Sequence, residues 1–262
     1  MKSNPLLNLD TKIGDAWFPR KLYNSKNWQY LCVLSGQLAG ISYILSFVAI
    51  GGLPPVPSYW DADRVHEHYF KHENGCKAAA ILLIMAGAFY LPWVAVISKH
   101  MRQIPNVDPI LCDLQLVSGA VGFCTIFTVP GVILATLISR DYGPELTLLL
   151  SDLFWTMNNI TWPAFWIQNW TLAWAVFADK SPNPIFPKVV GVVNVAAPVG
   201  GSLASGIHMQ FYGPMARNGA LAFWLPLGLF SVAYAADTLT LLWNIWTEPD
   251  MDAESECNLT AG

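Results

Sequence analysis

Charge is scarce in this sequence. Only 12% of its 262 residues are charged and 54% are hydrophobic, whereas about 25% of the residues of a soluble domain are charged. The mean hydropathy is +0.39 and the net charge is -4, so the chain is neither an ordinary soluble domain nor a basic protein suited to nucleic acid. The composition predicts an integral, multi-pass protein of the lipid bilayer.

Sequence patterns for metals, disulfides and phosphates are also lacking. The five cysteines are scattered without CxxC spacing, which indicates neither a disulfide framework nor a zinc site. No GxxxxGK[ST], GxGxxG, HExxH or GxSxG motif occurs. No DDxxD motif occurs either, so magnesium-dependent loss of diphosphate from a substrate is not expected. His66, His68 and His72 could bind a metal, but we interpret their segment as a solvated surface helix and expect neither metal nor cofactor.

Long apolar runs are what the sequence does contain. A run of about 20 apolar residues crosses the hydrocarbon core of a bilayer. We therefore predict an all-α polytopic bundle of about six transmembrane helices, with five to seven possible because the glycine-rich fifth run could be re-entrant. The runs are Trp28 to Leu53, Ala78 to Ile97, Ile110 to Ser139, Leu148 to Phe177, Val189 to Met209 and Leu221 to Trp246.

The regions outside these runs complete the predicted organisation. Residues 1–27 form a polar amino-terminal segment, 28–246 the bundle, and 247–262 an acidic tail. A short amphipathic helix is expected near 60–74, on the outer surface of the bilayer. With six spans, nine of the 14 Lys and Arg residues fall on the side of the two termini. Positive residues favour the cytosolic side, so both termini are predicted to be cytosolic.

The fourth run is the most unusual. Between Thr147 and Asp179 it carries five tryptophans together with Asp152, Asn158, Asn159, Gln168 and Asn169. On a continuous helix Asp152, Trp155, Asn159, Trp166 and Trp170 fall within about 60° of one another, which puts a carboxylate above a wall of indoles. Pro163 should kink this helix and open room for a ligand, and Lys180 to Pro187 should form a tight loop after it.

Carboxylates within predicted spans are candidate catalytic acids. A charge at membrane depth costs about 2.5 to 3.5 kcal/mol, so each needs a partner, water or a proton, and a buried carboxyl that keeps its proton can serve as a general acid. Asp113, Asp152 and Asp237 lie within spans. We predict that Asp152 or Asp237 is the acid, with Asn159 as a supporting catalytic residue. The alternative is that these aspartates only bond neighbouring helices.

Aromatic residues are the candidate binding surface. Indole faces stabilise cations by about 0.5 to 2 kcal/mol each and do not trap them as a hydroxyl would. We predict that an apolar substrate contacts Trp155, Trp162, Trp166, Trp170, Trp224 and Tyr234. The alternative is a packed aromatic core without a ligand.

Two further stretches carry a resemblance to known proteins. Phe177 to Asn194 contains PxFPxxxGxxN, and Gly213 to Phe230 contains GPxxxNGxxxFWxP. These patterns resemble a family of small bacterial integral membrane proteins. In its overall layout the chain also looks similar to the membrane-bound terpene cyclases of fungal meroterpenoid pathways, of the ascofuranone and macrophorin type. The resemblance implies an isomerase-type cyclase of secondary metabolism. It would protonate an epoxide or alkene of a lipophilic, prenylated substrate. It assigns no role to Asn194, Asn218, Phe223, Trp224 or Pro226.

A non-catalytic protein that binds or transports a lipid remains the alternative function. Broken helices with glycine and proline interruptions also occur at transporter sites. The sequence assigns no oligomeric state.

Overall fold

The computed structural model describes residues 24–160 and 162–248, and every regular element in these two ranges is helical. The predicted all-α class is therefore confirmed. The expected segments 1–27 and 247–262 lie almost entirely outside the described ranges. The elements that form the bundle are α2 (Ser25–Ala49), α4 (Glu73–Met101), α5 (Pro109–Gly122), η2 (Phe123–Thr128), α6 (Val129–Ser139), α7 (Pro144–Ile160), α8 (Trp162–Ala178), α9 (Lys188–Gly201), η3 (Ser202–His208), η4 (Ala220–Trp224) and α10 (Leu225–Thr247).

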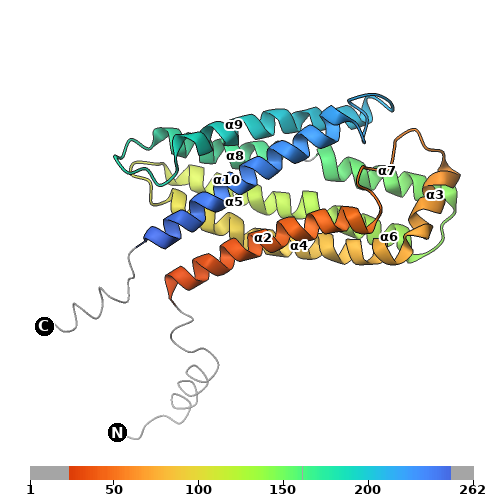
Figure 1. The fold of residues 1–262 in the computed structure, drawn as a ribbon, viewed down its shortest axis with the longest axis horizontal. Helices are drawn as coiled ribbons and strands as arrows, with labels where there is room; N and C mark the ends of the chain where they lie inside the picture. Colours follow the sequence, from red (N-terminus) through yellow and green to blue (C-terminus); the bar gives the residue numbers. More distant parts are fainter. Residues whose placement is uncertain (1–23, 161, 249–262) are drawn as a thin grey trace, which may run out of the picture.

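The helices run back and forth along one long axis (Figure 1). Five continuous stretches are long and apolar enough to cross a membrane: Ser25–Ala49, Glu73–Met101, Pro109–Ser139, Lys188–His208 and Ala220–Thr247. Lys188–His208 extends along the bundle instead of turning back, so the re-entrant alternative is not what the structure shows. Together with α7 and α8, these stretches form an integral multi-pass bundle.

The fourth run contains α7 and α8, which follow one another along the bundle (Figure 1). Residue 161, between them, lies outside the described residues. Pro163 is the second residue of α8. A proline ring clashes with the preceding turn and has no N–H to bond that turn, which is why a kink was predicted here.

The two ends of the described chain meet at the same end of the bundle. Gln29 Nε2 donates to a carboxylate oxygen of Glu248 at 2.7 Å, and Lys99 Nζ lies 3.7 Å from the other Glu248 oxygen. We call this the terminal end of the bundle. The opposite end is covered by α3 (Ala62–Lys71), the expected surface helix, which lies across the bundle axis (Figure 1).

Buried side chains and histidines fix α3 to the bundle. Val65 and Tyr69 are both fully buried, and His68 Nε2 donates to Ile50 O at 3.0 Å. Burial lowers the pKa of His68, and His72 lowers it further. His66 pairs with Asp141 at 2.9 Å. Among the described residues, no three His, Cys, Asp or Glu side chains are grouped to hold a metal.

Small residues let two helix pairs approach closely. A Cβ atom on Gly36 would lie 2.4 Å from Trp93 Cδ1, and one on Gly119 would lie 2.3 Å from Val94 Cγ1. The backbones of α2 and α5 therefore contact α4 closely, as small residues at helix interfaces allow.

The loop between α8 and α9 is organised by one carboxylate. Asp179 is 2% exposed; it accepts hydrogen bonds from Ser181 N at 2.9 Å and Ile185 N at 3.3 Å, and also from the Ser181 hydroxyl. Burial alone would raise the pKa of Asp179, but these hydrogen bonds and nearby Lys188 outweigh it, so the pKa is lowered.

Asp179→Ala is expected to lower the thermal midpoint of the purified protein in detergent. Charge-assisted hydrogen bonds contribute about 1.5 to 3 kcal/mol each, and several are lost. Because the folded-state pKa is lowered, the contribution is complete above about pH 4, the ordinary aspartate pKa, and decreases as the pH falls through the folded-state value. The difference from wild type should therefore shrink in acid. Lys180→Ala, at an exposed neighbour, is the control. Equal midpoints for Asp179→Ala and wild type at neutral pH would contradict this account.

Candidate functional site

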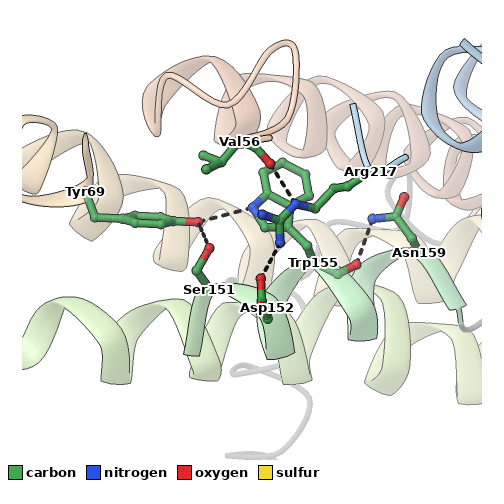
Figure 2. Close-up of polar contacts among 7 residues, drawn as sticks. All are labelled: Val56, Tyr69, Ser151, Asp152, Trp155, Asn159 and Arg217. Atoms are coloured by element: carbon green, nitrogen blue, oxygen red, sulfur yellow. Dashed lines mark hydrogen bonds and ion pairs between the residues drawn. The ribbon is translucent and has the colours of Figure 1, made fainter. Parts of the chain in front are cut away.

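The sequence-predicted acid Asp152 is paired with an arginine from a distant loop (Figure 2). Arg217 Nη1 donates to Asp152 Oδ1 at 2.8 Å, and Arg217 Nε donates to Val56 O at 2.6 Å. The Arg217 side chain is 5% exposed, whereas that of Asp152 is 51% exposed. The Asp152 carboxylate therefore accepts a charge-assisted hydrogen bond from a buried guanidinium, and this arrangement suits an ion pair better than a proton donor.

Trp155 lies under this ion pair and is fully buried. The Arg217 guanidinium carbon is 6.0 Å from the centre of its indole. Trp155 Nε1 donates to Tyr69 Oη at 3.2 Å, and Tyr69 Oη is 3.1 Å from Ser151 Oγ (Figure 2). Burial raises the pKa of Tyr69 to about 12, so the phenol keeps its proton. These contacts form what we call the arginine cluster: Tyr69, Ser151, Asp152, Trp155 and Arg217.

An aromatic pocket lies beside the arginine cluster, towards the middle of the bundle. Its volume is about 100 Å³, and residues from eight helical segments line it. Seven of these residues are aromatic: Tyr43, Phe47, Phe127, Trp162, Phe165, Phe223 and Phe230. Trp162, Phe165 and Phe230 are half-buried, so the pocket opens on the surface of the bundle.

Irregular helices build this pocket. Phe127 belongs to the π-helical segment η2, and Phe223 belongs to the π-helical segment η4. Such segments rotate side chains out of the regular helical register and are frequent at functional sites. Gly201, at the end of α9, faces empty space, because a Cβ atom there would meet nothing within 4 Å.

Two asparagines supply the polar part of the pocket. Asn158 accepts a hydrogen bond from Tyr43 Oη at 2.8 Å and donates to Ile126 O at 3.3 Å. Asn159 Nδ2 donates to Trp155 O at 2.7 Å (Figure 2). The Tyr43 hydroxyl is thus engaged with Asn158, and the remaining wall presents mainly carbon to a ligand.

The second predicted acid, Asp237, lies in a separate polar cavity of about 10 Å³. It is 3% exposed, and Asn194 Nδ2 donates to its Oδ1 at 2.7 Å. Tyr90, Trp93, Gln115, Gln168 and Tyr234 also line this cavity, and none of its lining residues is Lys, Arg or His. Phe165 and Phe230 line both the polar cavity and the aromatic pocket, so two rings separate Asp237 from the pocket.

The structure brings together only part of the predicted site. Asn159 and Trp162 line the aromatic pocket, and Tyr234 and Asp237 line the polar cavity. Asp152, Trp155, Trp166, Trp170 and Trp224 line neither. The expected single wall of indoles does not line one pocket, since Trp155 is fully buried whereas Trp170 is 40% exposed.

The remaining predicted tryptophans lie towards the outside. Trp166 donates to Pro198 O at 2.5 Å, and its ring centre is 4.3 Å from that of Trp170. Trp170 is 40% exposed and Trp224 is 45% exposed. Both therefore have substantial surface on the outside of the bundle.

Several residues of the site were not predicted from the sequence. Arg217, a charged residue outside the predicted apolar runs, is buried against Asp152. Its place within GPMARNG, directly before an apolar run, is the signal that could have indicated burial. Two other residues of the same pattern, Phe223 and Pro226, line the aromatic pocket.

The conformation of the loop that carries Arg217 explains part of the GPxxxNGxxxFWxP pattern. Gly213 has a φ of 87°, a conformation that favours glycine. A Cβ atom on Gly219 would lie 2.3 Å from Pro214 O. Both glycines thus allow the tight turn that carries Arg217 inward. Comparison with known protein families, curated proteins and solved structures gives no match to this chain.

Proposed function

We propose that this chain is a membrane-bound terpene cyclase that works without a metal and acts on a lipophilic prenylated substrate. The observation that carries the proposal is the aromatic pocket, which has seven rings and opens on the surface of the bundle. Ligand sites are usually about 300 to 1,000 Å³, so this pocket of about 100 Å³ would enclose the reacting end of a prenyl chain. The rest of the substrate would extend through the opening.

The lining suits a carbocation. Aromatic faces attract cations, by about 2 kcal/mol or more each where water is excluded. They offer no lone pair that would end the reaction as an alcohol or ether. The hydroxyl of Tyr43 could trap a cation in this way, but it is engaged in a hydrogen bond that it donates to Asn158.

Asp237 is the acid in this proposal, and Asp152 is not. Asp152 is engaged by a buried guanidinium, is half exposed and does not line the aromatic pocket. No cationic side chain lines the Asp237 cavity. A carboxyl buried without a counter-ion favours the protonated form that a general acid requires.

The proposed reaction begins with transfer of a proton from an Asp237 oxygen to the terminal epoxide oxygen or alkene carbon. The epoxide C–O bond or alkene π bond breaks, and an internal alkene attacks the resulting cation to close a ring. Loss of one proton from the last cation forms an alkene, so the substrate's composition is unchanged. The substrate's end would reach Asp237 between Phe165 and Phe230. Asn159 would orient the substrate from the far wall.

The proposed orientation places the terminal end in the cytosol. Lys99, Arg102, Lys180 and Lys188 follow or precede helices at that end, and Arg64, Lys71, Lys77, Arg140 and Arg217 lie towards the other. Cytosolic loops are enriched in Lys and Arg, and this supports cytosolic termini.

The direct test is a conversion assay. Membranes that contain this chain would be incubated with farnesylated phenols, with and without a terminal epoxide. The expected product is an isomer of unchanged mass and altered retention, absent from membranes that lack the chain. Unchanged substrates in the presence of well-folded protein would reject the cyclase for these substrates.

A binding or transport function is the second candidate, because none of the residues that line the aromatic pocket is charged. In that case the pocket would hold a prenylated lipid unchanged. Saturable binding of the farnesylated phenols without any conversion would favour this function over the cyclase.

Filling the aromatic pocket should abolish its use in either function. Gly201→Leu is expected to fold normally, because open space faces this position, and to reduce conversion or binding at least tenfold. Gly228→Leu is the matched control, since a Cβ atom there also meets nothing within 4 Å but the residue lies exposed on α10. Equal conversion and binding in the two variants would show that the substrate lies elsewhere.

A further inference from the structure

Buried polar atoms without a partner are concentrated along one route through the bundle. Ten buried side-chain nitrogen and oxygen atoms lack a hydrogen-bond partner in the described part of the chain, and only those of Ser58 and Arg217 lie off this route. The other eight belong to Gln29, Trp93, His100, Gln115, Asn194 and Asn244. An unsatisfied buried polar atom costs about 1 to 3 kcal/mol, so such a concentration indicates an occupant.

The route begins in a hollow at the terminal end of the bundle, which we call the vestibule. Its volume is about 510 Å³, and His100, Thr240, Asn244 and Glu248 are among its lining residues. His100 is 1% exposed. Gln103 faces its imidazole, but neither ring nitrogen makes a well-formed hydrogen bond.

Two helix faces connect the vestibule to Asp237. Asp237, Thr240 and Asn244 are spaced i, i+3 and i+7 on α10, and therefore share a face. Trp93 and His100 are seven residues apart on α4 and share a face in the same way. Asp237 is in the polar cavity and Thr240 is in the vestibule, so about one helical turn, or roughly 5 Å, separates the two.

Water is the occupant that fits these atoms. The polar cavity of about 10 Å³ has about the volume that one water molecule needs. Its unpartnered atoms include donors, Trp93 Nε1 and Gln115 Nε2, and acceptors, Gln115 Oε1 and Asn194 Oδ1. A metal cation would satisfy only the acceptors, whereas water both donates and accepts.

We propose that a file of water molecules, with His100 as a relay, carries protons between the vestibule and Asp237. The titratable and charged groups at its mouth are His100, Lys99 and Glu248, and those at its inner end are Tyr90, Tyr234 and Asp237. The purpose of the file rests on the proposed cyclase. In each cycle Asp237 gives one proton to the substrate, and the file returns one from solvent. The proton lost from the final cation goes to solvent, which keeps the balance.

Hydrogen exchange at the Asp237 carboxyl tests the file without any substrate. The full chain would be reconstituted in phosphatidylcholine bilayers and transferred from H2O to D2O. Infrared difference spectra would then follow the shift of the protonated carboxyl C=O band, assigned by its loss in Asp237→Asn. We expect at least tenfold slower exchange in Gln115→Leu and in His100→Phe. Tyr69→Phe, at the opposite end of the bundle, should exchange like wild type.

The outcomes separate this proposal from the cyclase. Wild-type exchange rates in both Gln115→Leu and His100→Phe would overturn the file, as would the absence of any band that depends on Asp237. If His100→Phe fails to fold, Gln115→Leu alone decides. Slowed exchange in a protein that converts no substrate would retain the file and reject the cyclase. Normal substrate conversion by the wild type, together with wild-type exchange rates in both variants, would retain the cyclase and reject the file.

Discussion

Asp237→Asn is expected to reduce conversion of the prenylated substrate by about 10²- to 10⁴-fold, the usual contribution of general acid catalysis. The amide cannot deliver a proton to an epoxide or alkene. It keeps the shape of the carboxyl and an oxygen that can accept the hydrogen bond from Asn194 Nδ2. It also removes an ionisable group that is 3% exposed within the bundle, so the thermal midpoint should be unchanged or higher. Initial rates and midpoints of the purified variant would be measured together.

Matched aspartate substitutions show whether this loss is specific. Asp152→Asn should retain most activity, because its ion pair with Arg217 lies outside the aromatic pocket. Asp113→Asn should be silent, since Asp113 is 59% exposed and pairs with Arg102 on the surface. Wild-type rates in Asp237→Asn would remove Asp237 as the acid. A loss of activity only in Asp152→Asn would move the chemistry to the arginine cluster.

The transmembrane fold could be predicted because lipid imposes a simple rule. Each spanning segment must satisfy its own backbone hydrogen bonds and present apolar side chains, so composition alone located the runs. The start of the first helix shows the remaining local error. We expected the bundle to begin at Trp28, but α2 begins at Ser25, where Asn24 Oδ1 accepts from Lys26 N at 2.9 Å as an N-terminal cap.

The candidate site was less predictable, because irregular backbone and long-range contacts build it. A helical wheel assumes a constant 100° per residue, and residues that it placed on one face differ in burial, since Trp155 is fully buried and Trp170 is 40% exposed. It also cannot represent the π-helical turns that aim Phe127 and Phe223 into the pocket. The pairing of Asp152 with Arg217 spans 65 residues, and no local pattern encodes it.

The compensated environment of Asp237 could be expected from the sequence. A carboxylate far from either end of an apolar run must be compensated, and this alone indicated a special environment. The structure adds the compensating groups, Asn194 and the polar cavity. Asn194 belongs to the PxFPxxxGxxN pattern, so its hydrogen bond to Asp237 offers a physical reason for an asparagine at that position.

Trp155→Ala is expected to lower the free energy of unfolding by about 3 to 5 kcal/mol, the usual cost of removing a large buried aromatic side chain. Trp155 is fully buried, and its ring centre is 5.6 Å from that of Phe47, with the two rings stacked. The substitution also removes the N–H that bonds Tyr69 and the indole face beneath Arg217. Trp155→Phe should cost less, since most of the packing remains and only the hydrogen bond and part of the ring are lost.

Unfolding of the purified variants in mixed detergent micelles measures this effect, and Trp174→Ala is the control. Trp174 is also on the fourth run but is 69% exposed, so its loss should change the free energy of unfolding by about 0.5 kcal/mol or less. Similar values for Trp155→Ala and Trp174→Ala would show that the arginine cluster does not stabilise the fold.

Because Phe47 also lines the aromatic pocket, Trp155→Ala should in addition weaken substrate conversion. Trp155→Phe should preserve conversion, since a ring remains to support Phe47. The stability and activity losses are thus expected to follow the same order, which links the arginine cluster to the pocket through packing and not through proton transfer.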